Sequence, residues 1–281
     1  MRLLLAYLKL FFSSIFKRDC RSKQFSKDFD LDALDLVSYQ KYLELVSGEG
    51  LARAEGIDHS ILPSYFYILC QPMLLELLAS KHCRLRPAGL IHKSWKCKNI
   101  LSYDPHQKSR VFAQLKDVSV DQYSYQIQCI FKIFQHETLV SEQESVFVKI
   151  RKRKSGKKQQ SFENSDERIQ TWSIDMKSLR SYASVSGDWN PIHLHRIFAR
   201  LSGFSHVLVH GMLLVGKVLA QYHEAHTNKV ALVQAHFYRP CFASEEVVLC
   251  NDGPIMENHQ KYVLYCRSHQ ACVLEISGPR S

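Results

Sequence analysis

Asp188 and His193 lie five residues apart in the stretch YASVSGDWNPIHLHRIFA, residues 182–199, with Asn190 and Pro191 between them. A carboxylate can accept a proton, and an imidazole exchanges one near neutral pH. Pro191 restricts its own φ angle and keeps the residue before it extended. The spacing therefore predicts a stiff, non-helical loop on which two side chains converge on one water molecule, with Asn190 bracing the loop through hydrogen bonds.

Gly211 opens a second segment of interest, GMLLVGKVLAQYHEAH, residues 211–226. This segment is apolar on nearly every side, which is typical of a helix that is surrounded by protein. The first N–H groups of a helix have no partner within the helix and carry partial positive charge. We therefore expect the N–H at Gly211 to stabilise negative charge on a substrate oxygen, and the glycine to allow close approach of an acyl group.

These groups match the requirements for adding water to an α,β-unsaturated thioester. The reaction needs a group that holds and deprotonates water, a proton for the α-carbon, and donors for the charge on the thioester oxygen. The sequence leaves open which of Asp188 and His193 takes the proton from water.

The run Ser186-Gly187-Asp188-x-Asn190-Pro191-Ile192-His193 resembles the signature of MaoC-like dehydratases and R-specific enoyl-CoA hydratases. The segments GFSHVLVHGMLL (203–214) and HFYRPCF (236–242) look like the entry to that family's central helix and one of its strands. The resemblance implies that Asp188 and His193 are the catalytic dyad and that Gly211 and Asn190 serve the oxyanion and the substrate. It also implies a (3R)-hydroxyacyl thioester as the product.

A pattern of one buried helix followed by several strands occurs twice along the chain. The first copy has a helix at 63–80, which Pro72 should kink or interrupt, and the second has the helix at 211–226. The strands expected after these helices are 89–100, 110–120 and 125–150 in the first copy, and 229–238, 245–251 and 261–276 in the second. A further helix is expected at 30–47. The pattern and the resemblance together predict an α+β protein with a tandem (double) hot-dog fold.

The chain should accordingly divide into four parts: a basic amphipathic segment (1–25), a degenerate N-terminal hot-dog half (26–150), a basic linker (151–168) and a C-terminal half with the motif (169–281). The first half lacks the Asp-x-Asn-Pro-x-His motif. We therefore expect one active site per chain, at the junction of the halves, with the first half forming a wall for the acyl chain.

The net charge of +10 is concentrated in two short segments. Residues 1–24 carry +5 and the run KIRKRKSGKK, residues 149–158, carries +7, so the remainder is close to neutral at −2. A basic stripe without a recognisable reading motif does not indicate nucleic-acid binding. The expected partners are instead anionic acyl thioesters of coenzyme A or of acyl carrier protein, and the sequence does not separate these carriers.

The N-terminal segment permits several interpretations. A helix that spans a bilayer needs about 20 apolar residues, whereas the run from Leu3 to Phe16 is shorter and contains Lys9. The small residues of a secretory cleavage site are missing. Arg2, Lys9 and Lys17 share one face of a helix, which favours attachment to a membrane interface, with docking onto the protein's own body as the alternative.

The nine cysteines are scattered and odd in number, which favours a reducing compartment such as the cytoplasm. Attachment through the N-terminal segment would then be at the inner membrane surface. His193, His195, His206 and His210 suggest a metal site, but no ordered pattern of cysteines or carboxylates accompanies them, so no metal is expected. No bound cofactor is expected either, because the thioester itself activates the alkene. The oligomeric state is left open, with a homodimer as one option.

The sequence therefore predicts a hydro-lyase, an enoyl-thioester hydratase or 3-hydroxyacyl dehydratase of fatty-acid or related lipid metabolism. Two alternatives stay open: an acyl-binding protein that has kept the fold and lost the chemistry, and a hot-dog thioesterase. The intact dyad argues against the first. The position of the motif in a loop before the helix, rather than on the helix, argues against the second.

Overall fold

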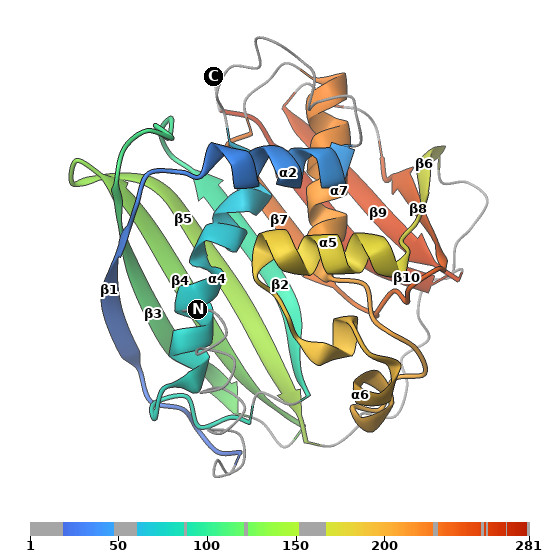
Figure 1. Cartoon of the computed structure of the whole chain (residues 1–281), viewed down its shortest axis with the longest axis horizontal. Coiled ribbons are helices and arrows are strands. Elements are labelled where there is room, and N and C mark those ends of the chain that lie inside the picture. The colour runs from blue at the N-terminus through green and yellow to red at the C-terminus, as the bar shows by residue number, and fades with distance from the viewer. Residues whose placement is uncertain are drawn as a thin grey trace. The chain divides into compact units, whose positions relative to one another are not determined.

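The computed structural model describes residues 19–47, 61–86, 89–120, 123–151, 167–226, 230–253, 256, 258–267 and 269–279 (Figure 1). Most of the expected N-terminal segment and of the basic linker lies outside these ranges. The chain divides into two compact units, Met1–Leu34 with Tyr67–Lys157 and Asp35–Phe66 with Lys158–Ser281. Each unit is described by itself below, and the four-part division remains a prediction.

The first unit contains a five-stranded antiparallel sheet with the order β1-β3-β4-β5-β2. Its strands are β1 Phe25–Leu31, β2 Leu90–Asn99, β3 Ser109–Val120, β4 Ser124–Gln135 and β5 Thr138–Ile150. The strands expected at 89–100 and 110–120 are confirmed, and the segment 125–150 forms a hairpin of two strands. β1 was not expected, because residues from 30 onward were assigned to a helix.

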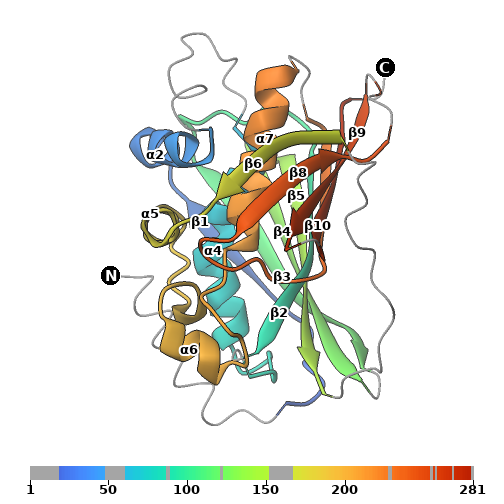
Figure 2. The same ribbon diagram turned by 90° about the vertical axis from the view of Figure 1, so that its right-hand side faces the viewer.

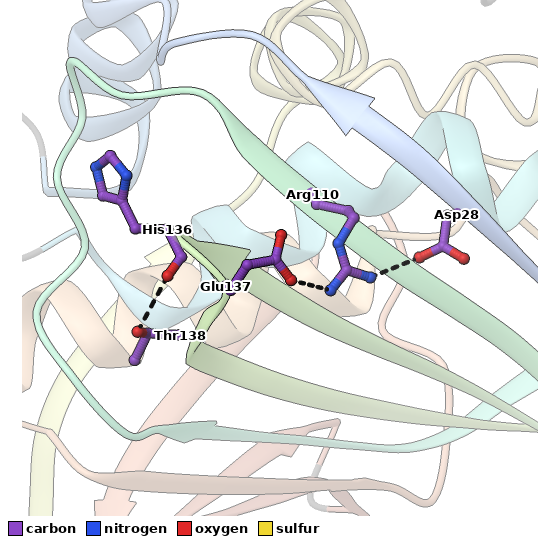
Figure 3. Close-up of polar contacts among 5 residues, drawn as sticks. All are labelled: Asp28, Arg110, His136, Glu137 and Thr138. Carbon is purple, nitrogen blue, oxygen red and sulfur yellow. Dashed lines mark hydrogen bonds and ion pairs between the residues drawn. The ribbon is translucent and has the colours of Figure 1, made fainter.

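The turn between β4 and β5 consists of His136 and Glu137, which both have positive φ angles, 46° and 60°. Two residues with positive φ produce a turn whose twist matches that of the flanking strands. Arg110 on β3 reaches Glu137 with one nitrogen (3.1 Å) and Asp28 on β1 with another (2.8 Å), as Figure 3 shows. These ion pairs bind the edge strand and the hairpin turn to the same guanidinium, at an exposed position where each pair contributes little energy.

Helix α4, Pro63–Ala79, supplies the buried helix of the first unit. From Tyr67 on, its side chains contact both edges of the sheet: Tyr67 stacks on His92 of β2, and Glu76 pairs with Lys27 of β1. Between them, Gln143 of β5 donates to the Cys70 sulfur at 3.5 Å. Pro72 was expected to kink the helix or to end its first half; the helix does not end there, since it continues through Pro72, and the kink stays a prediction. Pro72 and Glu76 are exposed while most of the other side chains are buried, so packing of the buried faces holds the helix together despite one missing backbone hydrogen bond.

The second unit contains another five-stranded antiparallel sheet, with the order β7-β10-β9-β8-β6. Its strands are β6 Glu167–Ser173, β7 Leu232–Phe237, β8 Glu246–Asn251, β9 His259–Cys266 and β10 His269–Ser277. The strands expected at 229–238 and 245–251 are confirmed, and the segment 261–276 is again a hairpin. β6 was not expected as a strand. It begins at Glu167, where the linker was expected to end, and pairs with β8.

Helix α7, Gly211–Ala225, is the buried helix of this unit, as expected for 211–226. It contacts both edges of its sheet, with Gly211 against Phe237 of β7 and the Lys217 ammonium 5.8 Å from the Trp172 ring of β6. Each unit thus has a curved antiparallel sheet with a helix in contact with both edge strands. None of the helices in the described part of the chain has the length and apolarity needed to cross a membrane.

Three short helical elements lie between β6 and α7: α5 Met176–Ser186, a 3-10 turn η1 Pro191–His193, and α6 Arg196–Leu201. A non-helical loop was predicted for the motif from Asp188 to His193, but Pro191–His193 forms a 3-10 turn. The structure keeps an irregular loop only between α5 and η1, and Figures 1 and 2 show the helical elements on either side of it.

Helix α2, Leu36–Ser47, is shorter than the helix expected at 30–47. Its start is set by Asp35, whose carboxylate accepts hydrogen bonds from the backbone N–H groups of Val37 (3.1 Å) and Ser38 (3.3 Å). The Ser38 hydroxyl also donates to the Asp35 carboxylate at 2.7 Å, and this hydrogen bond, together with the two from the backbone, holds the pKa of Asp35 below its usual value. The residues before Asp32 pair with β3 instead and form their backbone hydrogen bonds across the sheet.

The second unit brings α2 against α7 at Gly216, where an added Cβ would overlap the Tyr42 hydroxyl and lie 2.9 Å from Val46 Cγ1. Tyr42 is buried and donates to Ser64 Oγ at 2.7 Å. Lys217, the next residue of α7, donates to the carbonyl oxygens of Leu45 (3.3 Å) and Val46 (3.5 Å) near the C-terminus of α2. Burial lowers the pKa of Lys217, and the carbonyl groups of the helix end offset part of that cost.

Gly216→Ala should destabilise the protein by about 1–3 kcal/mol, because an extra methyl group overpacks the contact with α2. This cost should exceed the gain of about 1 kcal/mol that alanine brings to a helix interior. Urea unfolding at equilibrium measures the change. Tyr42→Phe removes the nearest atom, so Tyr42→Phe/Gly216→Ala should be less destabilised than the two single effects added together. Full additivity would contradict the close contact.

Candidate active site

The motif begins where α5 ends. Asp175 caps the first turn by accepting from the Ser178 N–H at 2.8 Å, which keeps the pKa of Asp175 below its usual value. At the other end, Gly187 has a left-handed φ of 71° and donates its N–H to the carbonyl of Ala183 at 2.9 Å. A glycine accepts this conformation without strain, so the chain turns sharply and Asp188 leaves the helix.

Two successive side-chain turns stiffen the loop that follows. The Asp188 carboxylate accepts from the Asn190 N–H at 3.2 Å, and the Asn190 side chain accepts from the Ile192 N–H at 3.4 Å. The Asp188 N–H itself donates to Ser186 Oγ at 3.1 Å. Pro191 then starts η1, where its ring suits the first position of a helical turn. Asn190 therefore braces the backbone through its side chain.

His193 is oriented by a backbone carbonyl. Its Nδ1 lies 3.0 Å from the carbonyl oxygen of Leu208, so the nitrogen donates and Nδ1 carries the proton. In the neutral imidazole Nε2 then holds a lone pair and can accept a proton. The backbone is fixed at the same point, because the Leu208 N–H donates to the carbonyl of Ile192 at 3.2 Å.

The carbonyl that orients His193 belongs to a segment that is itself paired with a neighbour far along the chain. Leu208 forms an antiparallel bridge with Phe242. On either side, the Val209 N–H donates to Cys241 (2.8 Å) and the Ala243 N–H donates to Val207 (2.9 Å). The orientation of the imidazole is therefore determined by a two-stranded element that no local pattern near His193 reveals.

His210 is the third side chain at this site. Its Nε2 lies 3.2 Å from the carbonyl oxygen of Asp188, to which it donates, and its ring stacks on that of His193 with centroids 4.0 Å apart. On the other side it contacts the ring of Tyr182 at 4.8 Å. His210 is the N-cap residue of α7, but its side chain makes no cap hydrogen bond to that helix and holds the Asp188 loop instead.

Burial lowers the pKa of His210 from 6.5 to about 3, and the neighbouring His193 acts in the same direction. The ring is therefore neutral at physiological pH, with the proton on Nε2 and a lone pair on Nδ1. That Nδ1 is buried and has no hydrogen-bond partner among the described residues. A buried acceptor without a partner costs free energy, which indicates a site that a water molecule or ligand can complete.

Asp188, His193 and His210 place one potential ligand atom each within 4.8 Å of one another. Such a trio suits a water molecule, and the same donor set fits a divalent metal ion, with each histidine oriented by a backbone carbonyl. The other two histidines considered from sequence are not in this group. His195 is the N-cap of α6, and His206 lies edge-on to Phe242. The expectation that no metal takes part stays a prediction.

Gly211 is the first residue of α7 and lies against Phe237, whose ring would be 2.8 Å from an added Cβ. The N–H groups of Leu213 and Leu214 both turn back to the His210 carbonyl, at 3.1 and 3.4 Å. The N–H of Gly211 comes before them, where helix geometry provides no intrahelical acceptor. Gly211 follows His210 directly in sequence, so the start of α7 lies next to the stacked imidazole rings of His193 and His210.

The pKa of His210 makes the stability of the protein pH-dependent. Below about pH 6.5 the unfolded imidazole binds a proton that the folded one does not, so stability should fall by about 1.4 kcal/mol per pH unit down to about pH 3. In His210→Phe this contribution disappears, and the dependence of the unfolding free energy on pH between 6 and 4 should be correspondingly less steep. His195→Phe, at an exposed position, serves as the control. Equal slopes in both variants would show that His210 titrates normally.

Comparison of the sequence with known families and proteins agrees with the motif. Residues 156–253 match the family model described as a MaoC like domain. The mitochondrial 3-hydroxyacyl-acyl-carrier-protein dehydratase of Arabidopsis thaliana is 34% identical over 91 residues, which cover 31% of this chain and 54% of that protein. The chain thus spans about half the length of this curated relative.

The fold is shared with solved structures over nearly the whole chain. HtdX of Mycobacterium tuberculosis superposes with a TM-score of 0.75 at 16% identity, covering 91% of this chain and 100% of HtdX. A hypothetical protein of the same organism, described as a double hot-dog fold, gives a TM-score of 0.60 at 10% identity over 92% of this chain and 96% of its own. The predicted α+β double hot-dog fold is therefore confirmed, and the residues from 156 to 253, with Asp188, His193 and Gly211 among them, are similar in sequence to the MaoC-like domain.

Proposed function

We propose that this protein catalyses the reversible hydration of trans-2-enoyl thioesters to (3R)-hydroxyacyl thioesters. The observation that carries the proposal is the convergence of Asp188 and His193 beside the first turn of α7, with the buried neutral His210 between loop and helix. The name of the Arabidopsis relative, a 3-hydroxyacyl-acyl-carrier-protein dehydratase, supports the same class of substrate.

In the hydration direction, the Asp188 carboxylate and Nε2 of His193 hold one water molecule. One of the two groups removes a proton from that water as its oxygen bonds to the β-carbon. The electron pair of the alkene moves toward the thioester, and the charge that develops on the thioester oxygen is stabilised by the N–H at Gly211. The α-carbon then takes up a proton, so the elements of one water molecule have been added.

The hydrogen bonds of the site support these roles for Asp188 and His193. Because Nδ1 of His193 donates to the Leu208 carbonyl, the lone pair of Nε2 is available to the water. One oxygen of Asp188 is engaged by the Asn190 N–H, and this contact positions the carboxylate without protonating it. His210 stays neutral and acts as a positioning residue, since it binds the backbone of Asp188 rather than its carboxylate.

The carrier of the acyl group is proposed to be coenzyme A or acyl carrier protein, and the protein is proposed to work in the cytoplasm. The support for the cytoplasm is the sequence, in which the nine cysteines are scattered and odd in number, as is typical of a reducing compartment. A series of enoyl thioesters of both carriers tests the function directly by absorbance. Loss of the enone signal without release of thiol indicates a hydratase, released thiol indicates a thioesterase, and neither change indicates an acyl-binding protein.

Asp188→Asn and His193→Ala should each lower kcat by about 10²–10⁴-fold, because each removes a positioned acid–base group. The double variant should be scarcely slower than the slower single variant, since groups that act on one water are strongly non-additive. Stopped-flow absorbance with an enoyl thioester measures the rates. His195→Ala is the matched control and should retain wild-type kcat. A folded Asp188→Asn protein with wild-type activity would contradict the mechanism.

Residues 1–24 are proposed to attach the protein reversibly to an anionic membrane surface. The support is the sequence pattern alone, in which Arg2, Lys9 and Lys17 share one face of an otherwise apolar helix. Deleting residues 1–18 should leave the hydratase activity intact, because Asp19 and Ser22, which accept hydrogen bonds from the backbone of Arg86 and Arg84, are kept. The deletion should reduce co-sedimentation with anionic vesicles at low salt. Unchanged co-sedimentation, or a loss of activity with loss of folding, would favour docking of the segment onto the protein itself.

A further inference from the structure

Helix α6, Arg196–Leu201, follows the active-site loop and presents an apolar surface to solvent. Figures 1 and 2 both show it beyond the end of α5, apart from strands β8 to β10 of its own unit. Its inner side is marked by Ala199, which is fully buried. Ile197 and Leu201 are 72% and 79% exposed, among the highest values for large apolar side chains in the described residues.

The spacing of these residues places them on defined sides of the helix. With about 100° between successive residues, Ile197 and Leu201 form one ridge that points directly away from Ala199. Arg196 and Arg200 form a second ridge on one flank. Phe198, which is 48% exposed, lies on the opposite flank. The outer face of α6 is therefore an apolar ridge with two guanidinium groups along one side.

The segment that carries this face has charges of one sign. No aspartate or glutamate occurs between Asp188 and Glu224, a stretch that contains Arg196 and Arg200. Both arginines are exposed, and neither forms an ion pair within the part of the chain that the structure describes. Single exposed apolar residues are common on protein surfaces, but a contiguous apolar face beside unpaired cations indicates a binding surface.

We infer that the outer face of α6 binds the surface of an anionic lipid bilayer, with Ile197 and Leu201 inserted among the acyl chains and Arg196 and Arg200 on lipid phosphates. This contact is independent of residues 1–24 and belongs to the folded second unit. It would hold the active-site loop close to the membrane, since Trp189 of that loop is also 46% exposed.

The shape and charge of the face favour a bilayer over a protein. A convex ridge needs a matching groove in a protein partner, whereas a bilayer deforms around it. A second copy of the chain in a two-fold contact would bring Arg196 and Arg200 opposite the same arginines, with no acidic residue in the stretch to separate them. Anionic phosphates supply the missing counter-charge.

A tryptophan probe tests the insertion at a single position. The full-length protein carries Trp189→Phe, together with Arg2→Gln, Lys9→Gln and Lys17→Gln so that these three cations of the N-terminal segment no longer attract anionic lipid. Leu201→Trp is then added; Val37→Trp on α2, at another exposed position (64% against 79% for Leu201), is the matched control. Brominated vesicles of equal parts phosphatidylcholine and phosphatidylglycerol should quench Trp at 201 and leave Trp at 37 unaffected. Absence of quenching at 201 would overturn the inference.

A second experiment measures vesicle binding by variants of the same background that lack the tryptophan probes. Ile197→Ser/Leu201→Ser and Arg196→Gln/Arg200→Gln should each weaken vesicle binding on the order of tenfold. Leu36→Ser/Val37→Ser should bind as the parent does, and vesicles of phosphatidylcholine alone should bind weakly. Relative to the shared background, hydratase activity on soluble thioesters should be the same in all these variants, so this result is separate from the test of the proposed function.

Three results would contradict the membrane contact. Equal vesicle binding by the Ile197→Ser/Leu201→Ser variant and its control would show that the ridge takes no part. A dimer in light scattering that becomes a monomer in this variant would identify the face as an interface between copies. Binding of an acidic acyl carrier protein that depends on Ile197 and Leu201, with no vesicle binding by the parent, would identify a protein partner.

Discussion

The arrangement of the site depends on one buried imidazole. His210 lies at the start of α7, donates to the carbonyl of Asp188, stacks on His193 and contacts Tyr182 of α5. Its burial keeps the ring neutral, so it can donate from Nε2 without adding a positive charge beside Asp188 and His193. A single side chain thereby couples the Asp188 loop, the helix that precedes it and the helix N-terminus that follows.

That coupling requires α7 to be held firmly, and the second unit does so through close contacts along the helix. Gly216 allows α2 to approach, and Lys217 binds the carbonyl groups near the end of α2. Gly211 allows the Phe237 ring to approach at the first turn. Side chains larger than glycine at these two positions would push α7 away from its neighbours, and His210 would move with it. Packing far from the reacting groups therefore decides the geometry of the loop.

The proposed chemistry uses groups whose protonation is set by backbone carbonyls. Leu208 fixes the proton of His193 on Nδ1, and Asp188 fixes that of His210 on Nε2. The two free imidazole nitrogens and the carboxylate then form a small polar group in a partly buried setting. The unpartnered Nδ1 of His210 costs stability, a cost that proteins commonly bear where a ligand or water completes a site.

The sequence by itself determined the features that depend on local pattern. The turn residues of the Asp188–His193 motif, the apolar segments that became α4 and α7, and most of the inner strands follow from side-chain type and spacing. β1 and β6 were missed because they are largely exposed edge strands with a weak apolar alternation, defined by pairing with residues distant in sequence. Only the tertiary structure decided where the protons of His193 and His210 lie and that His210 holds the loop. They depend on which carbonyl groups packing brings within hydrogen-bonding distance, and no local spacing specifies that.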